Sequence, residues 1–288
     1  MDKVLILGSE GMLGLSLVEL LGQFDYELKT HSRGGSTDFK FDAKNYDSLV
    51  DSLSQYKPDV LINLVANTSV DACEENPVLA FEDNALSVKN IVKWIKSSSN
   101  KTHLIHISTD QVYDREGPHE EENILLSNYY AYSKFIGEVN ARKINSTIIR
   151  TNFFGKSLSN KRASFSDWII DSLRSSNEIK VFTNVLFSPL SINSLVKLIE
   201  EIIRKRKIGT FNLGSNEGMS KAEFAFNLAD IFRLDHSLLT KIKDEEIQLK
   251  AYRPKDMRMN IKKFEREFSC TLPALIDEIK LIEGDYYD

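Results

Sequence analysis

The sequence has few cysteines, no excess of basic residues and no long hydrophobic run. Two cysteines, Cys73 and Cys270, are too few for a disulfide framework, and no group of residues has zinc-ligand spacing. We therefore predict that both are small hydrophobic residues and that there is no metal site. A net charge of −5 argues against a nucleic-acid partner, because proteins that bind polyanions normally carry a basic excess.

The chain also lacks an apolar run of about 18 residues, which a membrane-spanning helix would need. Its first apolar strand begins almost at the N-terminus, which leaves no room for a signal peptide. We therefore expect no membrane partner and a cytoplasmic protein.

What is present is an alternation of short apolar stretches with helical patterns. Strands are predicted at residues 3–7, 26–30, 59–66, 102–108 and 146–151. This order is typical of an α/β fold, with a doubly wound, mostly parallel Rossmann-type sheet and a smaller, mainly helical C-terminal substrate domain. We predict a dinucleotide-binding domain at residues 1–150, with later strands contributed from about 179–213, and a mostly substrate-binding part at 151–288.

The stretch "GSEGMLG" places a glycine-rich turn between the first strand and a helix. Glycines there allow a tight turn, a close approach to a pyrophosphate and packing of the helix on the sheet, while the helix N-terminus offers free N–H groups. The spacing is one residue longer than the usual fingerprint. We predict that this loop binds a dinucleotide through Gly8, Gly11, Met12, Leu13 and Gly14. Glu10 is expected to point to solvent, because a carboxylate facing the phosphates would be repelled.

The end of the second strand reads "KTHSRGG" and carries no acidic residue that could bind a bare ribose 2′-OH. A cation and a hydroxyl suit a 2′-phosphate, so Ser32 and Arg33 favour NADPH, with NADH as the second candidate. Asp42 is placed to meet the adenine end of the cofactor, although a turn-forming aspartate explains it nearly as well.

The stretch "SNYYAYSKFIGE" contains a tyrosine and a lysine at the spacing of one helix face. Tyr130 lies four residues before Lys134, on the same helix face. Tyr129 and Tyr132 lie five and two residues before it and are less well aligned with that face. An ammonium about 4 Å away could favour the phenolate by up to ~4 kcal/mol at an effective dielectric near 20. "ISTD" ends the fourth strand at the carboxyl edge of the sheet, where Ser108 and Thr109 can hydrogen-bond a carbonyl.

Taken together, the chain resembles the dTDP-4-dehydrorhamnose reductase family of the extended short-chain dehydrogenase/reductase superfamily. The matching stretches follow the family's order and span nearly the whole chain: "GSEGMLG", "KPDVLINLVANTSVDACEENP", "NALSVKNI", "HISTDQVYD", "NYYAYSKFIGE", "IIRTNFFG", "FSPLS", "GTFNLGSNEG" and "YRPKDMRMN". The resemblance implies a reductase that delivers hydride from NAD(P)H to C4 of a nucleotide-linked 4-keto-6-deoxy sugar.

The resemblance also implies individual roles. Tyr130 would protonate the developing alkoxide, Lys134 would hold the nicotinamide ribose and lower the tyrosine pKa, and Thr109 would hydrogen-bond the carbonyl. Further cofactor contacts would come from Ala66, Asn84 and Ser108. The residues that would face the substrate are Thr68, Val70, Thr109, Gln111, Phe153 and, at the diphosphate, Arg253.

Three positions depart from the family's pattern. Gln111 stands where an aromatic residue is usual, Phe153 replaces a tryptophan, and Ser16 replaces the glutamate of a metal-bridged dimer. The sugar, the nucleotide, the C4 stereochemistry and the oligomer, including a homodimer, stay open. Two alternatives also remain: an epimerase or dehydrogenase of the same superfamily, and a non-catalytic NADP-binding regulatory subunit.

Overall fold

The computed structural model describes residues 1–54, 56–97 and 101–287 and divides them into two compact units. Unit 1 comprises residues 1–109, 128–150 and 196–211, and unit 2 comprises residues 110–127, 151–195 and 212–288. Each unit is therefore built from segments that are distant in sequence.

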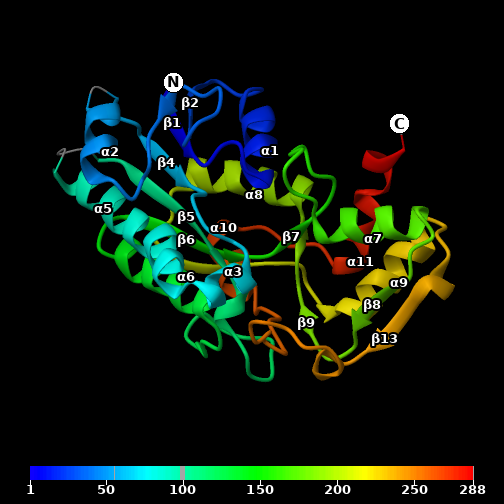
Figure 1. The fold of residues 1–288 in the computed structure, drawn as a ribbon. Helices are drawn as coiled ribbons and strands as arrows, with labels where there is room; N and C mark the ends of the chain where they lie inside the picture. The colour runs from blue at the N-terminus through cyan, green and yellow to red at the C-terminus, as the bar shows by residue number, and fades with distance from the viewer. Residues whose placement is uncertain (55, 98–100, 288) are drawn as a thin grey trace. The chain divides into compact units, whose positions relative to one another are not determined.

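The strands and helices are labelled as in Figure 1. The strands are β1 (Asp2–Leu7), β2 (Tyr26–Ser32), β3 (Phe39–Lys40), β4 (Val60–Asn63), β5 (His103–Thr109), β6 (Ser146–Thr151), β7 (Phe153–Phe154), β8 (Ile179–Phe182), β9 (Leu186–Phe187), β10 (Leu190–Ser191), β11 (Gly209–Leu213), β12 (Met219–Ser220) and β13 (Leu239–Ile242). The helices are α1 (Met12–Leu21), α2 (Tyr46–Leu53), α3 (Val70–Glu75), α4 (Pro77–Phe81), α5 (Ser87–Ser97), α6 (Tyr129–Ala141), α7 (Phe165–Arg174), α8 (Ile192–Lys205), α9 (Lys221–Ile231), α10 (Lys262–Phe268) and α11 (Leu275–Leu281). Single turns of 3₁₀- or π-helix are η1 (Glu82–Leu86), η2 (Asp110–Val112), η3 (His236–Leu238), η4 (Asp244–Glu246) and η5 (Glu283–Tyr286).

A seven-stranded sheet forms the centre of unit 1, in the order β11-β6-β5-β4-β1-β2-β3. The pairs β1–β2, β1–β4, β2–β3 and β4–β5 are parallel, and the order reverses beside β1. This is the doubly wound, Rossmann-like arrangement, so the predicted fold class is confirmed. A doubly wound sheet places its ligands at the carboxyl ends of the strands near that reversal.

Helices cover both faces of the sheet because its strands are apolar on both faces. Leu5, Leu7 and Leu61 pack on one side against α2 and α5, where Trp94 contributes the largest side chain. Figure 1 shows α2, α5 and α6 along that side and α1 and α8 on the other. The π-turn η1 lies between α4 and α5, and such turns often mark functional sites.

Unit 2 has its own core and three two-stranded sheets, β10–β7, β12–β9 and β13–β8. Of the later strands that we expected in the main sheet, β11 joins it but β8 does not. β8 instead pairs in parallel with β13, because its buried residues Ile179 and Val181 belong to the core formed with α7, α9 and α11. Capping boxes begin α7 at Ser164 and α9 at Ser220.

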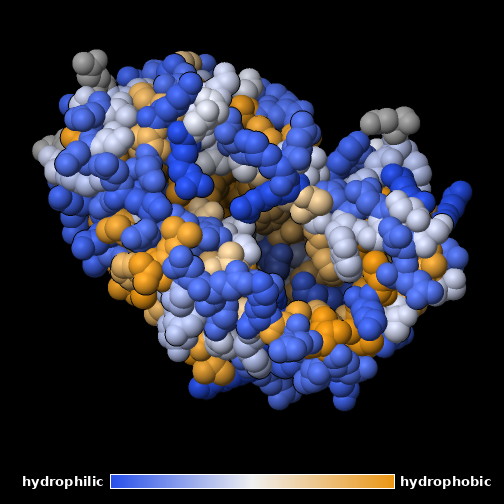
Figure 2. Space-filling view, viewed as in Figure 1, coloured by the Kyte–Doolittle hydropathy of each residue, from blue (hydrophilic) through white to orange (hydrophobic). Residues whose placement is uncertain are grey.

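Among the described residues, the structure contains no helix with the length and hydropathy needed to cross a membrane. The face of the molecule in Figure 2 is mostly hydrophilic, and its hydrophobic patches are scattered.

Candidate functional site

The glycine turn has the geometry that a dinucleotide cradle requires. Gly8 has a φ of +83°, and a Cβ at Gly14 would lie 2.6 Å from the Gly8 carbonyl oxygen. Larger residues would therefore strain the turn or displace it. No side chain caps α1 at Gly11, so the amides of its first turn, which include Met12 and Leu13, are left for an anion. The residues present fit a bound pyrophosphate.

The loop after β2 is tied to this turn by the backbone. The amides of Gly8 and Ser9 both donate to the His31 carbonyl at 3.0 Å. Ser32 is buried, and its Oγ accepts a hydrogen bond from the Gly35 amide at 2.8 Å. Arg33 is exposed and, within the described residues, has no hydrogen-bonding or ionic partner.

Glu10 does not point freely to solvent as expected. It is half-buried, and a Cβ at Gly35 would lie 1.4 Å from its Oε1. The carboxylate therefore packs on the backbone of the loop that also carries Arg33. Only the absence of a side chain at Gly35 makes this packing possible, and nothing local in the sequence links residues 10 and 35.

Asn84 links the loop after β4 to α6. It is fully buried in η1, its Oδ1 accepts from the Asn67 amide at 2.7 Å, and its Nδ2 donates to the Ser133 Oγ at 2.9 Å. Asn84 thereby joins the loop after β4, which contains Ala66, to α6. Asp42 accepts a hydrogen bond from the Lys44 amide at 3.0 Å, so it forms the turn that was its alternative explanation. Whether Asp42 also meets adenine stays a prediction.

Helix α6 separates its tyrosines by burial. Tyr130 and Lys134 are 7% and 3% exposed, whereas Tyr129 and Tyr132 are 48% and 49% exposed. The helix begins where the Asn128 Oδ1 accepts from the Ala131 amide at 2.8 Å. After this cap, the buried face of the helix carries Tyr130 and Lys134, and the exposed face carries the other two tyrosines.

Lys134 is fixed before any ligand arrives. Its Nζ donates to the Ile107 carbonyl at 2.6 Å, at the end of β5. Burial lowers the pKa of Lys134 to about 8, and the nearby Glu138 and Cys73 only partly offset this effect. The pKa of this ammonium is thus close to neutral pH, so small changes in its surroundings can change its charge.

A buried ion pair beneath this site was not predicted. The Glu138 carboxylate accepts from Arg150 Nε at 2.9 Å and Nη2 at 2.7 Å, and both side chains are fully buried. The Ser108 Oγ donates to the same carboxylate at 2.6 Å. Ser108 therefore cannot also donate to a substrate carbonyl as predicted, because its one proton is committed. The spacing of Glu138, four residues after Lys134, was the available signal.

The predicted substrate residues are distributed over both units. In unit 1, Thr68 is exposed, and Val70 begins α3 and packs against the cluster of Cys73, Ala80 and Tyr130. In unit 2, all three predicted residues are half-buried: Gln111, Phe153 and Arg253. Thr109 is buried at the end of β5.

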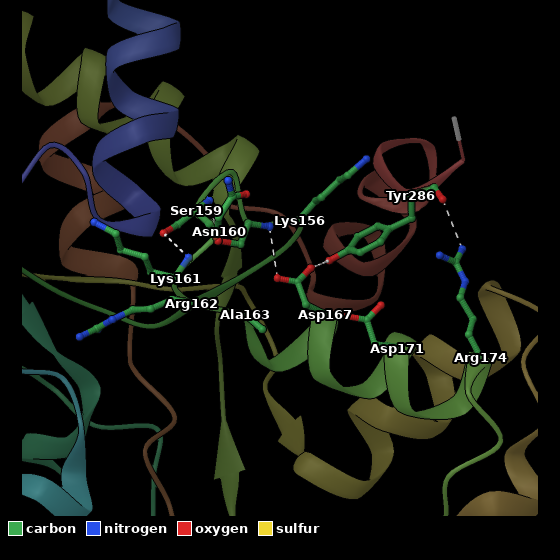
Figure 3. A pocket seen from close by; sticks show the side chains of 11 residues that line it. Lys156, Ser159, Asn160, Lys161, Arg162, Ala163, Asp167, Asp171, Arg174 and Tyr286 are labelled. Atoms are coloured by element: carbon green, nitrogen blue, oxygen red, sulfur yellow. Dashed lines mark hydrogen bonds between the residues drawn. The ribbon is translucent and has the colours of Figure 1, made fainter. Parts of the chain in front are cut away.

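A pocket of about 640 Å³ lies in unit 2 between residues 156–163, α7 and η5. Figure 3 shows that Tyr286 reaches Asp167 there, with its hydroxyl donating to Oδ1 at 2.5 Å. Asp167 Oδ2 also accepts from the Ser164 amide at 2.7 Å. The Asp167 carboxylate is part of the capping box at the start of α7, and no predicted site residue lines the pocket. We therefore assign the pocket no catalytic role.

Two further kinds of reactive group are a nucleophilic cysteine and a bound metal ion. Cys73 is fully buried, and burial raises the pKa of its thiol to about 11, so it is a poor nucleophile. The part of the chain that the structure describes contains no group of three or more His, Cys, Asp or Glu residues that could hold a metal ion.

Comparison with known proteins gives a match to the RmlD substrate binding domain over residues 2–285. The chain is 24% identical to the probable low-salt glycan biosynthesis reductase Agl14 of Haloferax volcanii, with 98% of each chain covered. It is 26% identical to a dTDP-4-dehydrorhamnose reductase of Sinorhizobium fredii, with 94% of this chain and 93% of that protein covered.

A third relative, methionine adenosyltransferase 2 subunit beta of Rattus norvegicus, is 26% identical over 91% of this chain and 81% of its own length. Among solved structures, a dTDP-4-dehydrorhamnose reductase from Bacillus anthracis in complex with NADP has a TM-score of 0.88 at 23% identity, with 99% of each chain covered. At that identity the likeness shows the shared fold.

Proposed function

Because the chain belongs to the family of the RmlD substrate binding domain, we propose that it is an NADPH-dependent reductase of a nucleotide-linked 4-keto-6-deoxy sugar. The family includes dTDP-4-dehydrorhamnose reductases and related glycan-biosynthesis reductases, so the resemblance noted in the sequence is confirmed. The chain is accordingly an NAD(P)H-dependent oxidoreductase.

The observation that carries the proposal is the burial of Tyr130 and Lys134 on one face of α6. A buried phenol one turn from a fixed ammonium is suited to deliver a proton, because the positive charge favours the phenolate that remains. When bound, the reduced nicotinamide supplies the hydride. Tyr130 gives its proton to the oxygen of the C4 carbonyl, so that the ketone becomes an alcohol.

The other residues of unit 1 prepare this step. Lys134 is oriented by the Ile107 carbonyl, and Asn84 fixes the loop after β4 against α6. Thr109 is buried at the end of β5, and in this proposal its hydroxyl hydrogen-bonds the carbonyl. The uncapped start of α1 receives the pyrophosphate.

We assign NADPH as the preferred cofactor because Arg33 is exposed at the loop after β2. Its guanidinium has no competing partner among the described residues, and a 2′-phosphate would provide one. NADH remains the second candidate, because the Glu10 carboxylate packs on this loop and would repel a 2′-phosphate.

The test is to supply purified protein with NADPH and a panel of nucleotide-linked 4-keto-6-deoxy sugars. We expect NADPH to be oxidised in equal amount to one reduced sugar, and Tyr130→Phe to serve as the inactive control. An epimerase would instead change sugar configuration without net NADPH oxidation. A regulatory subunit would bind NADPH and turn over none of the sugars, and either result would overturn the proposal.

A further inference from the structure

Lys221 in unit 2 is a partly buried lysine whose ammonium forms no ion pair with any described residue. Its Nζ lies 4.5 Å from the ring centroid of Phe165 and 4.9 Å from that of Phe187. Across the described residues, the ammonium makes no hydrogen bond or ion pair. The two aromatic rings orient the charge but do not neutralise it.

The backbone places Lys221 and Arg253 at the same end of a small sheet. β12 pairs antiparallel with β9, with Ser220 opposite Leu186, and the Lys221 amide donates to the Val185 carbonyl at 2.9 Å. On the other edge, the Leu186 amide donates to the Lys255 carbonyl at 2.7 Å. The chain before Lys255 and the chain after Ser220 therefore both leave the sheet at the amino end of β9.

The charges around Lys221 agree with this placement. Burial is the main effect that lowers the pKa of Lys221; Asp110 acts in the opposite direction, and the positive charge of Arg253 lowers the pKa further. Two cations thus lie near enough to repel each other in unit 2. Lys221 is also the first residue of α9, where the helix dipole disfavours a cation.

An anion would relieve both unfavourable effects, since it would attract the two cations and the positive end of α9. We propose that Lys221 is a second cation, beside Arg253, that binds the diphosphate of the nucleotide-sugar substrate. This inference rests on the proposed function. Lys221 is a binding residue in this role and takes no part in proton or hydride transfer.

The experiment compares Lys221→Met and Lys221→Arg with wild type. Lys241 supplies the matched control, because its Nζ lies 4.6 Å from the ring centroid of Phe226 but its side chain is exposed. For each protein we would measure KM and kcat with the best sugar of the panel, and the Kd values for thymidine diphosphate, thymidine and NADPH. Melting temperatures report on folding.

Lys221→Met should raise KM and the Kd for thymidine diphosphate roughly ten- to hundred-fold, as expected for a lost charge-assisted hydrogen bond. It should leave kcat, thymidine binding and NADPH binding near wild type. Lys221→Arg should restore most of the loss, and Lys241→Met should behave as wild type.

Two results would overturn the inference alone: wild-type KM in Lys221→Met, or a loss that affects thymidine and NADPH equally and is not rescued by arginine. A wild type that binds NADPH but reduces no sugar of the panel would overturn the proposed function, and the inference with it.

Discussion

The interior of α6 and the loop after β2 treat their charged groups in opposite ways. Around α6, Lys134, Glu138 and Arg150 are buried and bonded to the protein at distances between 2.6 and 2.9 Å. On the loop after β2, Arg33 is exposed and has no partner among the described residues. Both regions lie in unit 1, so the difference is local.

The contrast follows from what each region is proposed to meet. A proton donor must be aligned before the substrate arrives, and fixed hydrogen bonds supply that alignment without reorganisation during the reaction. A side chain that binds a phosphate contributes most binding energy when its hydrogen-bond donors have no other partner. Lys221 in unit 2 follows the second pattern, although it is held by aromatic rings.

A substitution on the buried face of α6 should have the largest effect on activity. Tyr130→Phe removes the proposed proton donor but keeps the ring in its buried cluster. General acid catalysis contributes roughly 10²–10⁴-fold, so we expect kcat to fall by that factor while the Kd for NADPH stays nearly unchanged. Steady-state kinetics and cofactor titration check this.

The matched control is Tyr132→Phe, because that tyrosine is 49% exposed on the same helix. It should retain wild-type turnover. The assignment is wrong if Tyr132→Phe is the more damaging change.

On the loop after β2 the expected effect is smaller. Arg33→Ala removes the cation proposed to meet the 2′-phosphate, and a charge-assisted hydrogen bond is worth roughly 1.5–3 kcal/mol. NADPH binding should therefore weaken about ten- to hundred-fold, while NADH binding barely changes. Titration of both cofactors decides this, and an equal loss for NADH would contradict the prediction.

Raising the pH should lower kcat through Lys134 on α6 and should not act through Arg33. Lys134 has a pKa of about 8, so its ammonium is charged below that pH and neutral above it. If the charge is required, kcat should fall about tenfold per pH unit above pH 8. Arg33→Ala should keep the same profile. A rate that stays constant to pH 10 would show that the charge on Lys134 is not needed.

The sequence was enough to predict the features that depend on local pattern. The glycine turn, the alternation of strands and helices and the buried face of α6 all follow from spacing within a few residues. The pairing of β8 with β13 joins residues 179–182 with 239–242, and no local pattern encodes such a partner.

Side-chain partners across the fold were also beyond local pattern. Ser108 was predicted to bind a carbonyl, but its proton goes to Glu138, which is thirty residues away. Lys221 did leave a local signal, because a lysine directly after the helix-capping Ser220 opposes the helix dipole. Its proximity to Arg253 required the sheet around β9.

The smallest expected effect comes from Glu10, which packs on Gly35 in the loop that carries Arg33. A carboxylate there repels a 2′-phosphate, and two unit charges about 8 Å apart in a water-like dielectric interact by roughly 0.5 kcal/mol. The phosphate carries up to two charges, so Glu10→Gln should strengthen NADPH binding about two- to five-fold. NADH, which lacks the phosphate, should bind as before. The gain should shrink at high salt because exposed charges are screened. A mutant that binds NADPH more weakly would mean that the carboxylate instead positions the loop for Arg33.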